Sequence, residues 1–205
     1  MPRDANDTDR ERARGTYAKG IARRQEILDR AIEVFAARGA EKTSLRAIAE
    51  RIGVSHAALT HYFSSREQLL VEVYREAAKR EDDHEATLRD LSPVEMMAVS
   101  AERNREVPGL VQLYSTLVAS AIEDGHPAAT EFARERFADL RDTLATQIAD
   151  RQERGLMRRD VDPHAIAALV IAASDGLQIQ WLLDADAPQD EALAMLSRML
   201  EPPRC

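Results

Sequence analysis

Apolar residues recur at intervals of three and four along most of this chain, which is the spacing of one face of an α-helix. No apolar run alternates with polar positions between turns, so the sequence contains no convincing β-strand. The pattern predicts a first helix at about residues 17–38, two short helices within 44–63, and a longer helix from 66 to about 84. Residues 1–16 have no periodicity and are expected to form a disordered arm, whose arginines could instead reach a DNA minor groove.

A glycine corner joins the two short helices. Ser44 is placed to cap the first of them, and Gly53 follows its apolar stripe where helices often end in a left-handed residue. Ser55 can cap the second helix, in which Leu59 and Phe63 are four positions apart and share the inward face. This arrangement predicts a helix-turn-helix, whose second helix can lie in the major groove of DNA.

Five further helices are predicted towards the C-terminus. Four begin at a proline, a residue favoured in the first turn of a helix, namely Pro93, Pro108, Pro127 and Pro163. The fifth runs from about residue 189 to 200. The fold class is therefore expected to be all-α with about nine helices, in which a three-helix bundle carrying the helix-turn-helix precedes a helical C-terminal domain.

The segment around the glycine corner resembles the DNA-binding domain of the TetR-type transcriptional regulators. The residues that match that family's pattern are Thr43, Ile48-Ala49, Gly53-Val54-Ser55, Leu59, Tyr62-Phe63, Ser65-Arg66-Glu67 and Leu69, with Ile27-Leu28, Ala31, Phe35 and Gly39 before them. The sequence departs from the pattern at Thr60, where Tyr is usual, at Ala57, where Gly is common, and at Arg66, which replaces Lys. The strong match covers roughly residues 20–75, and the remainder resembles the family mainly in its helical layout.

Charge is unevenly distributed, although the whole chain has a formal net charge of −8. Residues 1–80 contain 16 Lys and Arg against 12 Asp and Glu, whereas residues 81–205 contain 12 against 24. The positive excess coincides with the helix-turn-helix, as expected if only that end meets DNA phosphates. We therefore expect a DNA-binding domain at residues 17–65 and an effector-binding and dimerisation domain at residues 66–205.

The predicted DNA-binding face consists of the polar and small residues in and around the second short helix. They are Thr43, Ser55, His56, Ala57, Thr60, His61, Tyr62, Ser65 and Arg66. Ala57 and Thr60 suit apolar contact with thymine methyl groups, and His61 suits hydrogen bonds to base edges. Phosphate contacts are expected from Thr43, Tyr62, Ser65 and Arg66. Arg66 could also be an ordinary solvated surface charge.

A ligand pocket is predicted among the C-terminal helices, because the helix at residues 163–183 carries polar groups within an otherwise apolar sequence. A buried carboxylate or amide needs a partner, and a glycine inside a helix costs about 1 kcal/mol relative to alanine. The expected lining residues are Met97, Leu113, Leu117, Ser174, Asp175, Gln178 and Trp181. An apolar guest with a cationic or hydrogen-bonding end would fit. Alternatively, these residues are simply core and interface.

The same helix is apolar on every face, so it is expected to be buried on more than one side. We predict a homodimer formed by this helix and the closing helix at residues 189–200, in agreement with the four-helix dimer interface that the family resemblance implies. The expected interface residues are Ile171, Ile179, Leu182, Leu193, Leu196 and Leu200.

Motifs for catalysis or cofactor binding were not found. The sequence has no glycine-rich phosphate loop and no nucleophile elbow, and Asp162 is better explained as a helix cap than as a metal ligand. We expect no enzyme activity, no cofactor and no metal. The longest apolar run has nine residues, from Ala165 to Ala173, against the ~18–20 of a membrane span, so a cytoplasmic protein is expected.

Two functional classes remain open. The first is a dimeric repressor that binds operator DNA and is released from it by a small-molecule effector. The second is a helical protein–protein interaction module without DNA binding, in which the helix-turn-helix is only a packing unit. A mobility shift that weakens with salt would favour the first class, because counterion release makes DNA binding salt-dependent.

Overall fold

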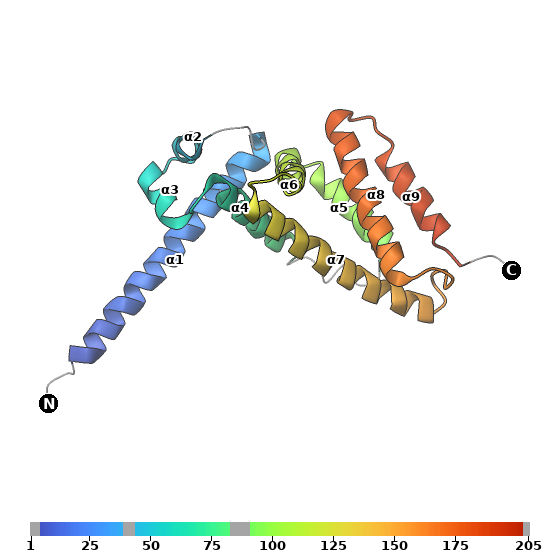
Figure 1. The fold of residues 1–205 in the computed structure, drawn as a ribbon, viewed down its shortest axis with the longest axis horizontal. Coiled ribbons are helices and arrows are strands. Elements are labelled where there is room, and N and C mark those ends of the chain that lie inside the picture. The colour runs from blue at the N-terminus through green and yellow to red at the C-terminus, as the bar shows by residue number, and fades with distance from the viewer. Residues whose placement is uncertain (1–4, 39–43, 83–90, 203–205) are drawn as a thin grey trace.

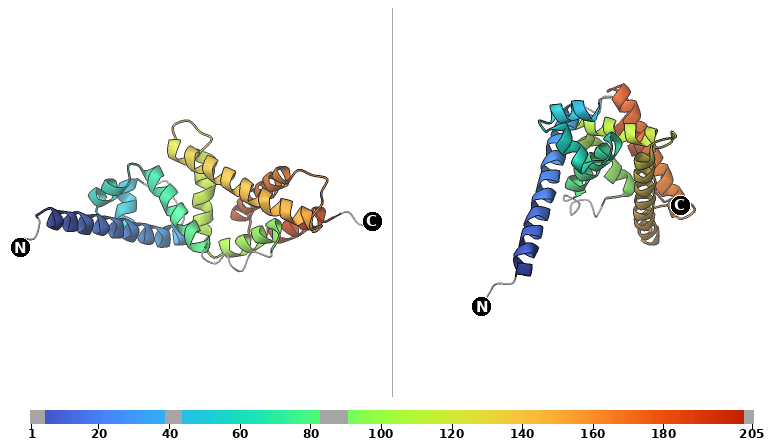
Figure 2. Two further views of the ribbon diagram at one scale, coloured as in Figure 1. Left: turned by 90° about the horizontal axis from the view of Figure 1, so that it is seen from below. Right: turned by 60° about the vertical axis from the view of Figure 1, so that its left-hand side comes forward.

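The structure is a computed structural model that describes residues 5–38, 44–82 and 91–202. These residues form nine α-helices and no strand, which confirms the all-α prediction (Figure 1). The helices are α1 (Ala5–Arg38), α2 (Leu45–Arg51), α3 (His56–Tyr62), α4 (Arg66–Asp82), α5 (Pro93–Asn104), α6 (Pro108–Ser120), α7 (Pro127–Glu153), α8 (Pro163–Leu183) and α9 (Gln189–Met199). Helices α1, α2 and α3 lie at one end of the molecule, and α8 and α9 lie at the other (Figure 2).

The first helix is longer than the sequence pattern predicts. Helix α1 begins at Ala5, so most of the region expected to be a disordered arm is helical, and in Figure 1 this end of α1 projects away from the remaining helices. Extending a helix adds one hydrogen bond for each residue that is fixed, whereas starting one is costly. Residues 5–14 include three arginines, two alanines and a glutamate, which favour helix, so the extension requires no apolar stripe of its own.

The predicted helix starts are confirmed by their side-chain caps. The hydroxyl oxygens of Ser44 and Ser55 accept hydrogen bonds from backbone N–H groups in the first turns of α2 and α3. Asp162 caps α8 in the same way. At α5, Ser92 accepts from the N–H of Glu95 while the Glu95 carboxylate accepts from the N–H of Ser92, a reciprocal capping box. These hydrogen bonds lower the pKa of Glu95.

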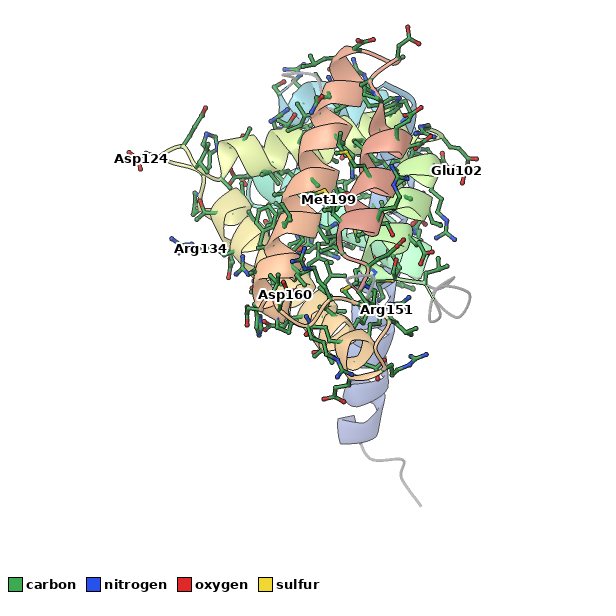
Figure 3. All side chains as sticks on the ribbon, turned by 90° about the vertical axis from the view of Figure 1, so that its right-hand side faces the viewer. Glu102, Asp124, Arg134, Arg151, Asp160 and Met199 are labelled. Carbon is green, nitrogen blue, oxygen red and sulfur yellow. The ribbon has the colours of Figure 1, made fainter. Side chains whose placement is uncertain are left out.

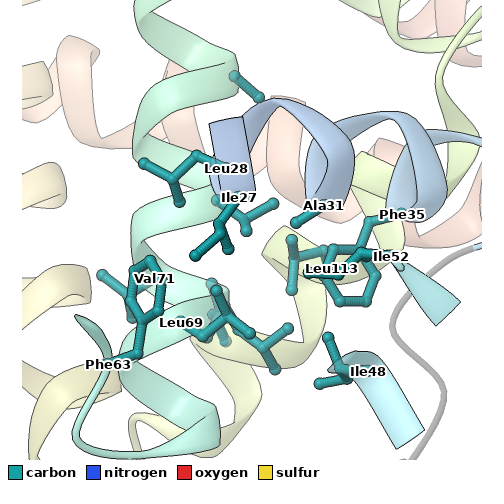
Figure 4. Packing of buried hydrophobic residues seen from close by; sticks show 14 of the residues in the cluster. Ile27, Leu28, Ala31, Phe35, Ile48, Ile52, Phe63, Leu69, Val71 and Leu113 are labelled. Atoms are coloured by element: carbon teal, nitrogen blue, oxygen red, sulfur yellow. The ribbon is translucent and has the colours of Figure 1, made fainter. Parts of the chain in front are cut away.

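The described residues bury their apolar side chains in two clusters. The first cluster joins α1, α2, α3 and α4 to α6 and the beginning of α7, and Figure 4 shows Leu113 of α6 beside Phe35 of α1. The second cluster joins α5, α7, α8 and α9. Helices α4 and α6 therefore share a core with the helix-turn-helix. The boundary at residue 66 stays a prediction, and the first cluster extends across it.

Candidate DNA-binding face and ligand cavity

One side of α3 is anchored in the core and the opposite side is open. Leu59 and Phe63 are almost completely buried in the first cluster, as their spacing predicts. Four residues predicted to face DNA are exposed on α3, namely His56, Ala57, Thr60 and His61. The helix therefore presents a short, polar and sterically open face to solvent, of the kind that can enter a major groove.

The hydroxyl group of Thr60 is already engaged with the helix backbone. It donates to the carbonyl oxygen of His56 at 3.1 Å, with the carbonyl oxygen of Ala57 at 3.2 Å. A hydroxyl that donates to its own helix cannot donate the same hydrogen to a base edge. The methyl group of Thr60 is then the part of this side chain that is available for an apolar contact.

The turn between α2 and α3 is held by a residue that sequence reasoning missed. Gly53 has φ +70°, the left-handed conformation expected at this corner. Arg30 of α1 donates from Nη1 to the carbonyl oxygen of Gly53 at 3.3 Å, and its Nη2 pairs with Glu26 at 2.7 Å. Arg30 thus satisfies a carbonyl group at the end of α2 and ties the corner to α1. Nothing in the sequence pattern of α1 indicates this contact.

The start of α4 lies directly after α3. Ser65 accepts a hydrogen bond from the N–H of Gln68 at 3.0 Å and so caps α4, yet its hydroxyl hydrogen can still be donated to a phosphate. Arg66 is half-buried, and burial lowers the pKa of its guanidinium, although it stays charged at neutral pH. Tyr62 is also half-buried, and Thr43 lies outside the described residues.

The first turn of α4 also caps α7. The carboxylate of Glu67 accepts from the N–H of Ala128 at 3.0 Å and lies 2.7 Å from Nδ1 of His126. Because a carboxylate ion can only accept, Nδ1 must carry the hydrogen in this pair. A second contact between the two helices lies further along α4, where Arg75 forms an ion pair with Glu135 of α7 at 2.5 Å. Helix α7 is therefore fastened to α4 at the end that adjoins α3.

A cavity of about 160 Å³ lies between α4, α5, α6, α7 and α8. Its lining residues are Tyr74, Ala77, Ala78, Met97, Ser100, Asn104, Leu110, Val111, Tyr114, Arg136, Leu140, Ile171, Ser174, Asp175 and Gln178. Four of the residues expected in a pocket are among them, namely Met97, Ser174, Asp175 and Gln178.

The other three expected pocket residues lie elsewhere. Leu113 and Leu117 belong to the first core cluster, because α6 turns Leu110, Val111 and Tyr114 towards the cavity instead. Trp181 is half-buried and does not line the cavity. The spacing of apolar residues identified α6 as a buried helix, but it could not show which of its faces meets the cavity.

A polar cluster occupies one side of the cavity. The hydroxyl of Tyr114 donates to Oδ2 of Asp175 at 2.9 Å, and the ring of Tyr114 stacks on that of Tyr74 with centroids 5.1 Å apart. The guanidinium of Arg136 lies over both rings, 5.3 Å from the centroid of Tyr74 and 5.0 Å from that of Tyr114. Burial raises the pKa of Asp175, against the opposing effects of Tyr114 and Arg136. Burial, followed by the nearby Asp175 carboxylate, raises the pKa of Tyr114.

Two further polar side chains in the cavity are available to form hydrogen bonds with a guest. Ser174 is 3% exposed and Gln178 is 9% exposed, and within the described part of the chain neither side chain makes a hydrogen bond. Buried polar groups are normally paired, so these two can supply donors and acceptors to a guest. Asp175, by contrast, is already paired with Tyr114.

The outer faces of α8 and α9 form an apolar surface at the C-terminal end, and Figure 3 views these two helices from that side. Its exposed residues are Leu169, Ile179, Leu183, Met195 and Met199. By length and composition, α8 alone among the described helices could cross a membrane, yet part of it is buried against the second cluster.

The residues predicted to form the dimer interface divide between this surface and the core. Ile171, Leu193, Leu196 and Leu200 are buried in the second cluster of the same chain, so the prediction that they face a partner is wrong. Ile179 is exposed and Leu182 is half-buried. A helix that is apolar all round gives no sequence signal for which side its own chain covers.

Comparisons with known proteins agree with this architecture. Residues 27–73 match the family of bacterial regulatory proteins called tetR, and residues 96–202 match the C-terminal domain of BetI-type transcriptional repressors. The HTH-type transcriptional regulator PksA of Bacillus subtilis is 29% identical over 172 residues, covering 79% of this chain and 80% of PksA. A probable acrEF/envCD operon repressor of Escherichia coli is 24% identical over 179 residues, covering 84% of this chain and 81% of the relative.

Among solved structures, a putative transcriptional regulator from Saccharomonospora viridis in complex with choline is similar. It has a TM-score of 0.64 and 25% identity, and the match covers 87% of this chain and 94% of that one. The two family matches together include the helix-turn-helix and most of the helices that enclose the cavity. The chain therefore belongs to the TetR family of bacterial regulatory proteins and is a DNA-binding transcriptional repressor.

Proposed function

We propose that this repressor acts as a homodimer, which binds a palindromic operator through its two α3 helices and releases it when a small molecule fills the cavity. The observation that supports this most directly is the position of α4. It begins at Arg66, next to α3, and lines the cavity with Tyr74, Ala77 and Ala78. A change in the cavity can therefore reach the DNA-binding end through one continuous helix.

The exposed face of α3 is the proposed base-reading surface. Ala57 and the methyl group of Thr60 would contact thymine methyl groups, and His61 would hydrogen-bond to a base edge. His56 and Ser55 lie at the N-terminal end of α3, which is the end that reads base edges in helix-turn-helix proteins. Phosphates would be held by Tyr62, by the hydroxyl of Ser65 and by the charge of Arg66, with Thr43 as a further candidate.

The coupling between cavity and DNA is proposed to run through α4 and α7 together. Glu67 ties the start of α7 to the start of α4, and Tyr74 contacts Phe132 of α7 edge-to-face with centroids 5.5 Å apart. Arg136 is one turn further along α7 and reaches into the cavity. A guest can shift this pair of helices only if it binds one arrangement better than the other.

The apolar surface of α8 and α9 is proposed as the dimer interface. Five large apolar side chains are exposed on these two helices, and an apolar patch of this kind commonly marks an association site. A two-fold axis through this surface would pair two chains so that their α3 helices face successive major grooves, about 34–36 Å apart. In this arrangement residues 17–65 read DNA and residues 66–205 sense the ligand and dimerise. A repressor of this kind acts in the cytoplasm, where its operator lies.

The direct test is protection of DNA next to the coding sequence. We expect the purified protein to protect a palindrome, with an affinity that falls steeply as salt is raised. Failure to bind any DNA at low salt would favour the alternative of a helical protein–protein interaction module. Sedimentation of the free protein and of its DNA complex would give the number of chains in each.

A further inference from the structure

The cavity contains a half-buried positive charge, that of Arg136, which makes no ion pair with a carboxylate in the described part of the chain. Arg136 is permanently charged, and its Nε atom is buried without a hydrogen-bond partner. An ion pair requires a carboxylate oxygen within 4.0 Å of a guanidinium nitrogen, and in the described part of the chain no carboxylate comes that close to Arg136. Against the effect of burial, Tyr74, Tyr114 and, from beyond ion-pair distance, Asp175 raise the pKa of Arg136. The Oδ2 atom of Asp175 accepts from the hydroxyl of Tyr114. A cation that is partly removed from water and has no ion pair is stabilised by an anion that can reach it.

The aromatic rings of the cavity are not free to receive a second cation. The faces of Tyr74 and Tyr114 are where a cationic guest would gain a cation–π interaction. Arg136 already lies over both rings. A cationic guest would have to displace this guanidinium or be repelled by it, whereas an anionic guest would meet it directly. The occupied rings therefore favour an anion.

The size of the cavity limits the guest. A cavity of about 150 Å³ in another protein holds one benzene molecule, and the volume here is about 160 Å³. A guest of about six to eight non-hydrogen atoms therefore fits. Part of the wall is apolar, formed by Met97, Val111, Leu140 and Ile171, which suits a short hydrocarbon body. The rest of the lining is polar and includes hydrogen-bonding groups of Ser100, Asn104, Ser174 and Gln178.

We propose that the effector of this repressor is a small aliphatic monocarboxylate, with its carboxylate on the guanidinium of Arg136 and its hydrocarbon body against Met97, Val111 and Ile171. This assignment rests on the proposed function, because it takes the same cavity as the sensing site. It replaces the apolar guest with a cationic or hydrogen-bonding end that the sequence suggested. The choline bound by the Saccharomonospora viridis regulator is the competing chemistry.

The test compares four probes by titration calorimetry on the protein alone: 3-methylbutanoate, its neutral amide, 3-methylbutylammonium and choline. The first three share one hydrocarbon skeleton, so charge is the variable among them. We expect 3-methylbutanoate to bind and the amine and choline not to bind, with the amide much weaker than the acid. Binding of choline or the amine in preference to the acid, or no binding of the acid at millimolar concentrations, overturns the proposal.

Substitutions in and outside the cavity test whether 3-methylbutanoate binds there. Arg136→Gln should weaken 3-methylbutanoate by about ten- to a hundredfold, the value of a charge-assisted hydrogen bond. Arg134→Gln removes the same charge from an exposed position on α7 and should leave binding unchanged. Asp175→Asn removes the nearby negative charge, so it should preserve or strengthen binding of the acid. A cationic guest would instead lose affinity in Asp175→Asn. This variant therefore distinguishes an anionic from a cationic guest even if Arg136→Gln does not fold.

The two proposals fail in distinguishable ways. Calorimetry without DNA tests the ligand class, and release of a protected operator tests the repressor. Operator release by choline with no response to the acid would leave the repressor mechanism intact and overturn the monocarboxylate. Acid binding that never changes DNA affinity would retain the ligand class and overturn the proposed release.

Discussion

At the scale of single residues, the DNA-binding face divides into side chains that would read sequence and side chains that would hold phosphate. Thr60 illustrates the first group, because its hydroxyl donates to the carbonyl of His56 and only its methyl remains for a base contact. Thr60→Val keeps a methyl group and should therefore preserve base preference, whereas Thr60→Asn should change it. Selection of preferred sites from a randomised DNA pool would measure both. The same preferred sites from wild type and Thr60→Asn would contradict the docking.

Arg66 illustrates the second group. Losing one phosphate contact lowers the slope of log affinity against log salt by about 0.9, so Arg66→Ala should weaken binding to all sequences alike and reduce that slope. Arg154→Ala, exposed near the far end of α7, is the control and should change neither quantity. Titrations at several salt concentrations give the measurement. An unchanged slope in Arg66→Ala would show that this side chain does not contact phosphate.

At the scale of elements, the corner between α2 and α3 fixes the orientation of α3. A β-carbon added at Gly53 would lie 3.7 Å from Nη1 of Arg30, which is ordinary contact, so Gly53→Ala is strained by its positive φ alone. Gly155 has the same φ of +70° and open space around it, far from the DNA face. Both substitutions should cost about 1–2 kcal/mol of stability. Only Gly53→Ala should also weaken operator binding by more than its loss of stability explains. Thermal unfolding would measure the stability of both variants, and mobility shifts would measure their affinity for the operator.

The contact between α4 and α7 should determine how strongly effector binding in the cavity is coupled to release of the operator. Glu67→Gln keeps a side chain of the same size but replaces the charged acceptor that caps α7. We expect effector affinity to change little and effector-dependent release of operator to weaken several-fold, because an amide can accept from only one of the two donors, so α7 is fastened less firmly to the DNA-binding end. Comparing effector binding with operator release in this variant separates the two effects. Loss of both together would mean that Glu67 only supports folding.

The element scale is also where sequence reasoning succeeds best. Each predicted helix is present, and Ser44, Ser55 and Asp162 cap helices as their positions predict. These features depend on neighbours within a few residues, so the local sequence contains the information. The length of α1 is the exception, since a helix can extend without an apolar stripe once it has begun.

Contacts between distant helices could not be predicted in the same way. The polar cluster of the cavity brings together Tyr114 and Asp175, 61 residues apart, and adds Arg136 from a third helix. The sequence identified Asp175 because a carboxylate within an apolar helix is conspicuous. It gave no sign of Arg136, because an arginine on a long, charged helix such as α7 is indistinguishable from a solvated one until the helix rotation is known.

At the scale of the whole molecule, the outer apolar surface and the DNA-binding end lie far apart along the chain but must act together if the repressor is dimeric. Figure 1 shows α8 and α9 at the end opposite α3. Pairing two chains through that surface fixes the separation of the two α3 helices, and a palindromic operator requires one particular separation. Dimer formation is therefore expected to be a condition of tight operator binding.

The test of this whole-molecule prediction is to place a charge on the outer surface. Leu183 is 84% exposed on α8, so Leu183→Asp should leave the folded chain intact while burying an unpaired charge in the dimer. We expect wild type to sediment as a dimer, and Leu183→Asp to sediment as a monomer with greatly weakened operator binding. Ile122 is 89% exposed in the turn between α6 and α7, so Ile122→Asp is a matched control that should remain dimeric. If Leu183→Asp stayed dimeric and bound the operator normally, the two chains would have to meet through a different surface.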